Sequence, residues 1–228
     1  MKARILTIVF VSLCVAAGTP SHAQALGHNL KFFVGYSNLQ AEGLGNKNND
    51  LPDILDTSFF RDRTTLHGAN AELTVAFKGI GVTADTSFNR KREGTDAVGA
   101  HDFNNNDLWY FLAGPSFAYA GEGKVEPFAR VMAGVGHTRF EIGHTNTSNA
   151  VTTSIANSNT NFALGVGGGL DVRLGEGPYR LRVIQVDYVP VFLGEKVVSF
   201  RDEFGALQQT SLRKQHLNNV RFSFGFVF

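Results

Sequence analysis

Cysteine is nearly absent from this chain. The 228 residues include one cysteine, Cys14, which lies in an apolar run near the start. Once that run is removed during export, the remaining chain has no disulfide, no thiolate metal site and no cysteine nucleophile. No later uninterrupted apolar stretch approaches the roughly 18 residues that a transmembrane helix needs. If the protein spans a membrane, it must therefore do so with strands.

Residues 1–23 have the pattern of a secretory signal peptide. Lys2 and Arg4 form a basic start, an apolar run follows, and a small-x-small cleavage pattern ends at Ala23. We expect residues 1–23 to be the signal peptide and residues 24–228 to form one domain. That domain has 19 Lys and Arg against 20 Asp and Glu, a formal charge of −1. This balance gives no electrostatic footprint for nucleic acid.

The C-terminal stretch alternates between two faces, as a strand does. Large apolar side chains occupy every second position, at Val220, Phe222, Phe224, Phe226 and Phe228. The other face is mostly small or polar and includes Arg221. Such a strand suits the lipid-facing wall of a membrane barrel, although a soluble sandwich also buries strands of this kind.

Period-two alternation predicts eight strands along the chain. They cover residues 29–37, 65–78, 80–90, 107–119, 126–142, 160–174, 179–193 and 216–228. The connections alternate between short and long. The short ones are 78–80, 120–125 and 175–178, and the long ones are 38–64, 91–106, 143–159 and 194–215. Up-and-down strands place all short turns at one end and all long loops at the other, as outer-membrane barrels do.

We therefore predict an all-β fold, an eight-stranded antiparallel up-and-down transmembrane β-barrel in a bacterial outer membrane. Closure removes the unpaired sheet edges that lipid cannot hydrate. Residues 197–200 and 206–212 are expected to extend the last hairpin beyond the bilayer. A ten-stranded barrel is the alternative.

Charged residues at mid-strand fall on the inner parity. We expect a lumen network made of Glu72, Asp85, Arg130, Gln185, Asp187 and Arg221. An eight-stranded barrel is only wide enough for side chains to fill it, so we expect a filled polar interior in which these charges pair. The inward glycines among residues 165–169 should make room for neighbouring arginine side chains.

Two residues fit the pattern poorly. Pro115 lies within a central-looking strand, where it cannot donate to the ladder, so we expect a bulge or a weakened register there. Arg182 falls on the lipid parity of its strand. It must either reach the head groups by snorkelling or be turned inward by a bulge.

No catalytic motif stands out. The chain has no Gly-x-Ser-x-Gly elbow and no His-Glu-x-x-His, and no serine is marked as a partner for His67, His137 or His216. We expect no enzymatic activity, no cofactor and no metal. Residues 145–160 are almost all Thr, Ser, Asn and Ala, which indicates a mobile external loop.

Several short motifs, in their order along the eight strands, resemble the OmpA-like outer-membrane β-barrel domain family. They are Phe-Val-Gly-Tyr-Ser at 33–37, Gly-Pro-x-Phe at 114–117, Gly-Gly-Gly-Leu-Asp-Val at 167–172, Gln-Val-Asp-Tyr at 185–188 and the final phenylalanine. The resemblance implies that the barrel-assembly machinery recognises the C-terminal strand, with Val220, Phe222, Phe224, Phe226 and Phe228 as the assembly signal. The chain departs from two-domain members, because no peptidoglycan-binding domain follows the barrel, so we expect a single-domain member without peptidoglycan anchoring.

The expected role is structural within the envelope or one of surface interaction, with slow passage of small solutes as an addition. The partners would be outer-membrane lipid, lipopolysaccharide and the assembly machinery, with no nucleic acid, and the barrel would be a monomer. Two alternatives stay open. One is a narrow pore or ion channel through a polar lumen, and the other is a secreted lipocalin-like barrel that binds an apolar ligand inside.

Membrane fractionation tests the barrel prediction. The protein should stay with membranes after a carbonate wash, and heating in detergent should change its electrophoretic mobility, because a closed barrel resists unfolding by detergent until it is heated. A protein that washes off and shows no mobility change is not a membrane barrel.

Overall fold

The computed structural model describes residues 29–43, 62–77, 79–119, 123–148, 151–202, 204 and 206–228. The expected signal peptide lies outside these residues. Among the residues described, no helix is long and apolar enough to cross a membrane.

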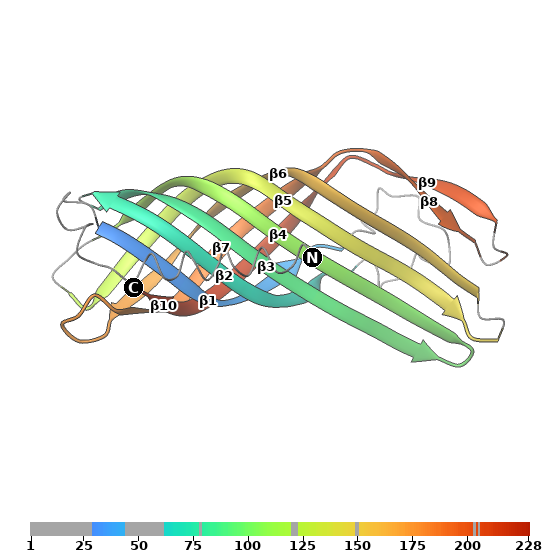
Figure 1. The fold of residues 1–228 in the computed structure, drawn as a ribbon, viewed down its shortest axis with the longest axis horizontal. Helices are drawn as coiled ribbons and strands as arrows, with labels where there is room; N and C mark the ends of the chain where they lie inside the picture. The colour runs from blue at the N-terminus through green and yellow to red at the C-terminus, as the bar shows by residue number, and fades with distance from the viewer. Residues whose placement is uncertain are drawn as a thin grey trace, which may run out of the picture.

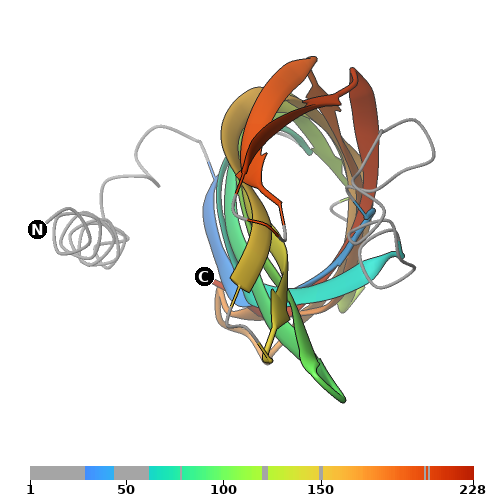
Figure 2. The ribbon, with the colours of Figure 1, turned by 90° about the vertical axis from the view of Figure 1, so that its right-hand side faces the viewer.

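Eight antiparallel strands form a closed ring (Figure 1), which Figure 2 shows nearly end-on. They are β1 (Asn29–Ala41), β2 (Thr64–Phe77), β3 (Ile80–Ala97), β4 (Ala100–Ala118), β5 (Val125–Asn146), β6 (Val151–Arg173), β7 (Arg180–Leu193) and β10 (Gln215–Val227). Consecutive barrel strands pair with each other, and β1 closes the ring against β10. The predicted eight-stranded up-and-down barrel is confirmed.

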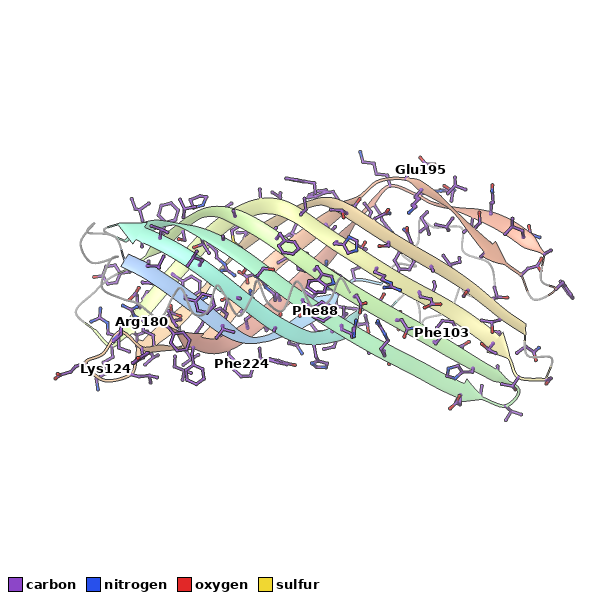
Figure 3. The ribbon with its side chains drawn as sticks, viewed as in Figure 1. Phe88, Phe103, Lys124, Arg180, Glu195 and Phe224 are labelled. Carbon is purple, nitrogen blue, oxygen red and sulfur yellow. The ribbon has the colours of Figure 1, made fainter. Side chains whose placement is uncertain are left out.

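The outer wall of the ring is apolar. Val82 is 64% exposed and Phe224 is 55% exposed, whereas their neighbours Thr83 and Ser223 are buried. Figure 3 shows Phe224 directed away from the barrel. Because the large aromatics of the last strand point outward, the lipocalin-like alternative, which needs them inside, is excluded.

One end of the barrel carries tight turns. Gly79 and Gly175 lie in two of them with φ of 85° and 77°, a conformation that residues with a Cβ rarely adopt. Lys124 and Arg180 lie at this end in Figure 3. We call it the turn end.

At the opposite end the strands run much further than predicted. β3 and β4 stay paired as far as Ala97 and Ala100, and β5 and β6 as far as Asn146 and Val151. Residues 91–97, 100–106 and most of 143–159 are therefore strand, and the prediction of long loops there is wrong. Backbone pairing continues along these mostly polar strands, and one face of them is buried at Asn104, Asn106, Thr153 and Ile155.

A second small sheet completes this end. β8 (Lys196–Arg201) pairs only with β9 (Leu207–Leu212), so the ten-stranded alternative is wrong and the predicted extension of the last hairpin is present. This hairpin packs on β5 and β6 through a buried apolar cluster of Phe140, Ile142, Ile155, Val198, Phe200 and Leu212. We call β8, β9 and the strand segments 91–106 and 139–159 the extension.

Pro115 leaves the strand register unchanged. It pairs with Val82 on β3, and the pairs Ala113 with Ala133 and Ser116 with Arg130 on β5 keep one register across it. The expected bulge is absent here. Only the pairing of Pro115 and its neighbour to β5 is interrupted, as the missing N–H requires.

Replacing Ile155 with Asp tests whether the extension has its own core. Ile155 is fully buried, so an unpaired charge there should loosen the extension and speed its cleavage in limited proteolysis by at least about tenfold. The heat-dependent mobility of the barrel should stay normal. Val197→Asp, on the exposed face of β8, is the matched control and should change little. Equal protection of both variants would contradict the packing.

Candidate functional site in the barrel interior

The polar residues that sequence alternation assigned to the inner face do lie inside the ring. None of Glu72, Asp85, Arg130, Gln185, Asp187 and Arg221 is more than 3% exposed. They come from five strands, β2, β3, β5, β7 and β10, and they form one connected cluster that we call the ionic network. Buried charges are tolerated when they meet opposite charges and hydrogen-bond partners, so the pairing within the network decides its stability.

Arg221 of β10 holds two aspartates. Its Nη1 and Nη2 lie 2.9 and 2.8 Å from the two carboxylate oxygens of Asp85, a forked pair. Its Nη2 lies 3.0 Å from Asp187 Oδ2, and its Nη1 donates to Ser87 Oγ at 2.8 Å. Arg221 thereby links β10 to β3 and β7 across the lumen.

Arg130 of β5 holds the same two aspartates from the other side. It forks onto Asp187 at 3.0 and 2.8 Å, and its Nη2 reaches Asp85 Oδ2 at 3.2 Å. Its Nη1 also lies 2.5 Å from Glu72 Oε1, an ion pair without the alignment of a hydrogen bond. The two arginines and two aspartates therefore form a closed square.

The network has two charged members that we did not predict, Arg182 and Asp171. Arg182 forks onto Asp171 at 2.7 and 3.1 Å, and its Nη1 donates to Glu72 Oε2 at 2.6 Å. Its guanidinium also lies 4.3 and 4.1 Å from the ring centroids of Phe33 and Phe128. Asp171 shares the parity of the inward glycines of β6, so the alternation contained a signal for it.

Arg182 reaches the interior because β7 bulges next to it. Val183 and Ile184 are both exposed, at 45% and 46%, although they are consecutive. Pairing with β10 shifts there between Ser223 and Gly225. One extra residue reverses the parity of everything beyond it, so the bulge explanation is right and snorkelling is wrong.

A smaller ion cluster lies nearer the turn end. Lys31 donates to Glu126, and Arg180 Nε lies 3.2 Å from the second Glu126 oxygen. Glu126 is almost fully buried, and the two cations are 18% exposed. Glu126 alternates with the outward residues Val125 and Val131, and this parity in the sequence indicated its inward position.

An apolar layer fills the lumen on the extension side of the network. Its buried members are Leu39, Ala41, Leu66, Leu108, Tyr110, Leu112, Met132, Ala163, Val189, Val191, Leu193 and Leu217. The Tyr110 hydroxyl accepts a hydrogen bond from Asn219 at 2.8 Å. The expectation of a polar interior is wrong for this layer, because these strands carry apolar residues on both faces.

Two small cavities lie inside the barrel. A cavity of about 30 Å³ adjoins Glu72 and Arg182, and one of about 20 Å³ adjoins Leu108 and Leu217. Each holds roughly one or two water molecules. The two share no lining residue, and the network and apolar layer lie between them. In the part of the chain described, no group of three or more His, Asp or Glu is placed to bind a metal ion.

Gly167 makes room for a carboxylate, not for an arginine as expected. It pairs with Asp187, and a Cβ on Gly167 would lie 2.2 Å from Asp187 Oδ1. The glycine therefore lets Asp187 stand where both arginines reach it.

A third charged group lies on the outside of the barrel, beyond the rings of Phe88 and Trp109, which are tilted by 34° with centroids 4.1 Å apart. Arg90 Nε and Arg92 Nη2 lie 2.9 and 3.0 Å from the two oxygens of Asp107. Partial burial acts to raise the pKa of the Asp107 carboxyl, but hydrogen bonds from Arg92 and Arg90 outweigh it and hold that pKa below its ordinary value.

Comparison with known proteins relates the chain to outer-membrane barrels. The outer membrane protein OprG from Pseudomonas aeruginosa is 13% identical over 88% of this chain and 94% of its own, with a TM-score of 0.50. A major outer membrane protein from Thermus thermophilus is 14% identical over 88% and 99%, also with a TM-score of 0.50. No family model and no curated protein matches the sequence. The likeness is one of fold.

The fold and the site define a class. A closed ring with an apolar outer wall, a charged interior and tight turns at one end is an integral outer-membrane β-barrel protein.

Arg221→Ala tests the ionic network. The change leaves two buried carboxylates with fewer partners, so it should lower the free energy of unfolding by about 3–5 kcal/mol. Urea unfolding from lipid vesicles, followed through the chain's one tryptophan, Trp109, measures this. Ser223→Ala, at a buried position on the same face, is the control and should cost less than about 1 kcal/mol. Equal losses would show that the network does not stabilise the ring.

Proposed function

We propose that this barrel is a non-enzymatic, non-conducting protein of the cell envelope whose role is to present its extension at the cell surface. The single observation that carries the proposal is the contrast between a closed lumen and an extension with a core of its own. The lumen offers no passage, whereas the extension offers a large structured surface.

The closed lumen supports the non-conducting part. A solute would have to break the forked pairs of Arg221 and Arg130 and then cross an apolar layer that includes the buried Met132 and Leu112. The pore alternative and slow solute passage both relied on a continuous polar lumen, and the apolar layer interrupts it.

The extension supports the surface role. β3 continues from Arg90 to Ala97, roughly 20 Å at about 3.3 Å per residue, and the β8–β9 hairpin packs on its neighbours. Figure 1 shows β8–β9 on one side and the ends of β3 to β6 on the other. A rigid scaffold that carries exposed segments is a common basis for binding.

A serine–histidine pair does occur near the extension, but it lacks a carboxylate. His137 Nε2 lies 3.3 Å from Ser158 Oγ, and its Nδ1 lies 2.9 Å from Thr160 Oγ1. A catalytic triad has an orienting group, usually Asp or Glu, at that second nitrogen. The arrangement therefore favours a non-enzymatic role.

The same proposal includes membership of the OmpA-like family, with the turn end in the periplasm and the extension outside. The barrel-assembly machinery would recognise the apolar face of β10, where Phe222, Phe224 and Phe226 are exposed. Lipid and lipopolysaccharide would surround the outer wall, and the barrel would act as a monomer.

Conductance and surface behaviour test the proposal together. Wild-type protein in planar bilayers should give no steady conductance up to about 100 mV. On cells, the proposal predicts that the wild-type barrel changes cell settling and retention on glass. Replacing residues 94–103 with Asn-Gly should abolish both effects, because the turn shortens the β3–β4 arm without touching the barrel.

Met132→Gly is the control for the bilayer measurement, since it opens the apolar layer and should raise conductance. Open wild-type channels would contradict the closed lumen. Unchanged settling and retention in cells with the shortened arm would contradict the surface role of that arm.

A further inference from the structure

Three arginines cluster on the exterior of the barrel where it leaves the apolar band. Arg90 and Arg92 are on β3, and Arg139 is on β5. Asp107 of β4 lies between them, because it pairs with Arg90 on one side and Arg139 on the other. All four residues have outward parity.

Asp107 does not neutralise this cluster. Both of its oxygens already accept hydrogen bonds from Arg90 and Arg92, whose side chains stay 54% and 45% exposed. Among the described residues, Arg139 has no ion-pair partner although it is exposed. Counting the exposed Glu141 two positions further on, the face keeps an excess of one positive charge.

The position of the cluster along the membrane normal indicates which class of ligand it can meet. Arg90 and Asp107 lie two residues beyond Phe88 and Trp109, whose contacting rings mark the interfacial girdle. Arg90 also lies over the Phe88 ring, 5.2 Å from its centroid. Guanidinium groups at this level face lipid head groups, and their planar donors match phosphate oxygens.

We propose that Arg90, Arg92 and Arg139 form a binding site for the phosphate groups of a phosphorylated glycolipid in the outer leaflet. Asp107 orients the first two arginines, and Arg139 supplies a cation that no described carboxylate occupies. The leaflet assignment rests on the proposed orientation, with the extension outside the cell. The site would hold the barrel in the lipopolysaccharide layer.

Native mass spectrometry of the full-length mature barrel in detergent tests the site with defined probes. Bisphosphorylated lipid A should bind the wild type roughly tenfold more tightly than it binds the R90Q/R139Q double variant, as expected for lost charge-assisted hydrogen bonds. Lys124→Gln with Lys214→Gln removes the same charge elsewhere on the exposed surface, and this control should bind like the wild type. Dephosphorylated lipid A should bind the wild type and the R90Q/R139Q variant equally weakly.

Equal binding of lipid A by the wild type and R90Q/R139Q would overturn the proposal. Inorganic phosphate that displaces lipid A at equal phosphate concentration would overturn the lipid assignment. If the double variant does not fold, Arg139→Gln alone replaces it, because Arg139 has no described ion pair to lose. Labelling a T147C variant on intact cells tests the orientation separately, so failure of the site and failure of the proposed topology are distinguishable.

Discussion

The barrel depends on two arginines that share two aspartates. Arg221 and Arg130 approach Asp85 and Asp187 from opposite sides, so four strands are tied through the lumen and not only through their neighbours. Lipid offers no water to an unpaired group, so the ring must close and its charges must pair inside. The small Gly167 beside Asp187 follows from this constraint, because a side chain there would displace the shared carboxylate.

The same interior accounts for what the molecule presents outside. Forked ion pairs on the turn side and an apolar layer on the extension side separate two cavities that each hold one or two waters. With the lumen filled, the exposed chemistry lies on the outer wall and the extension. The apolar cluster around Ile155 gives that extension an order that does not depend on lipid.

Alternation was informative wherever one face of a strand meets lipid and the other meets the lumen. It assigned Phe224 to the outer face and Arg221 to the inner face. Applied to β5 and β6, it also places Glu126 and Asp171 on the inner face. It failed at Arg182, because one bulged residue reverses parity and leaves no mark in composition. It failed again at residues 91–106 and 143–159, where most side chains on both faces are polar, so the paired strands show no apolar alternation.

The sequence by itself determined the all-β class, the eight spanning strands, the outward aromatics and most of the residues that carry inward charge. These follow from local periodicity, because one face of each spanning strand meets lipid and the other meets the lumen. Only the tertiary structure decided which arginine meets which aspartate, that the lumen is layered, and that the outer arms are strands. Those features depend on register, on a bulge and on contacts between distant segments, and periodicity within one segment carries no information about its partner.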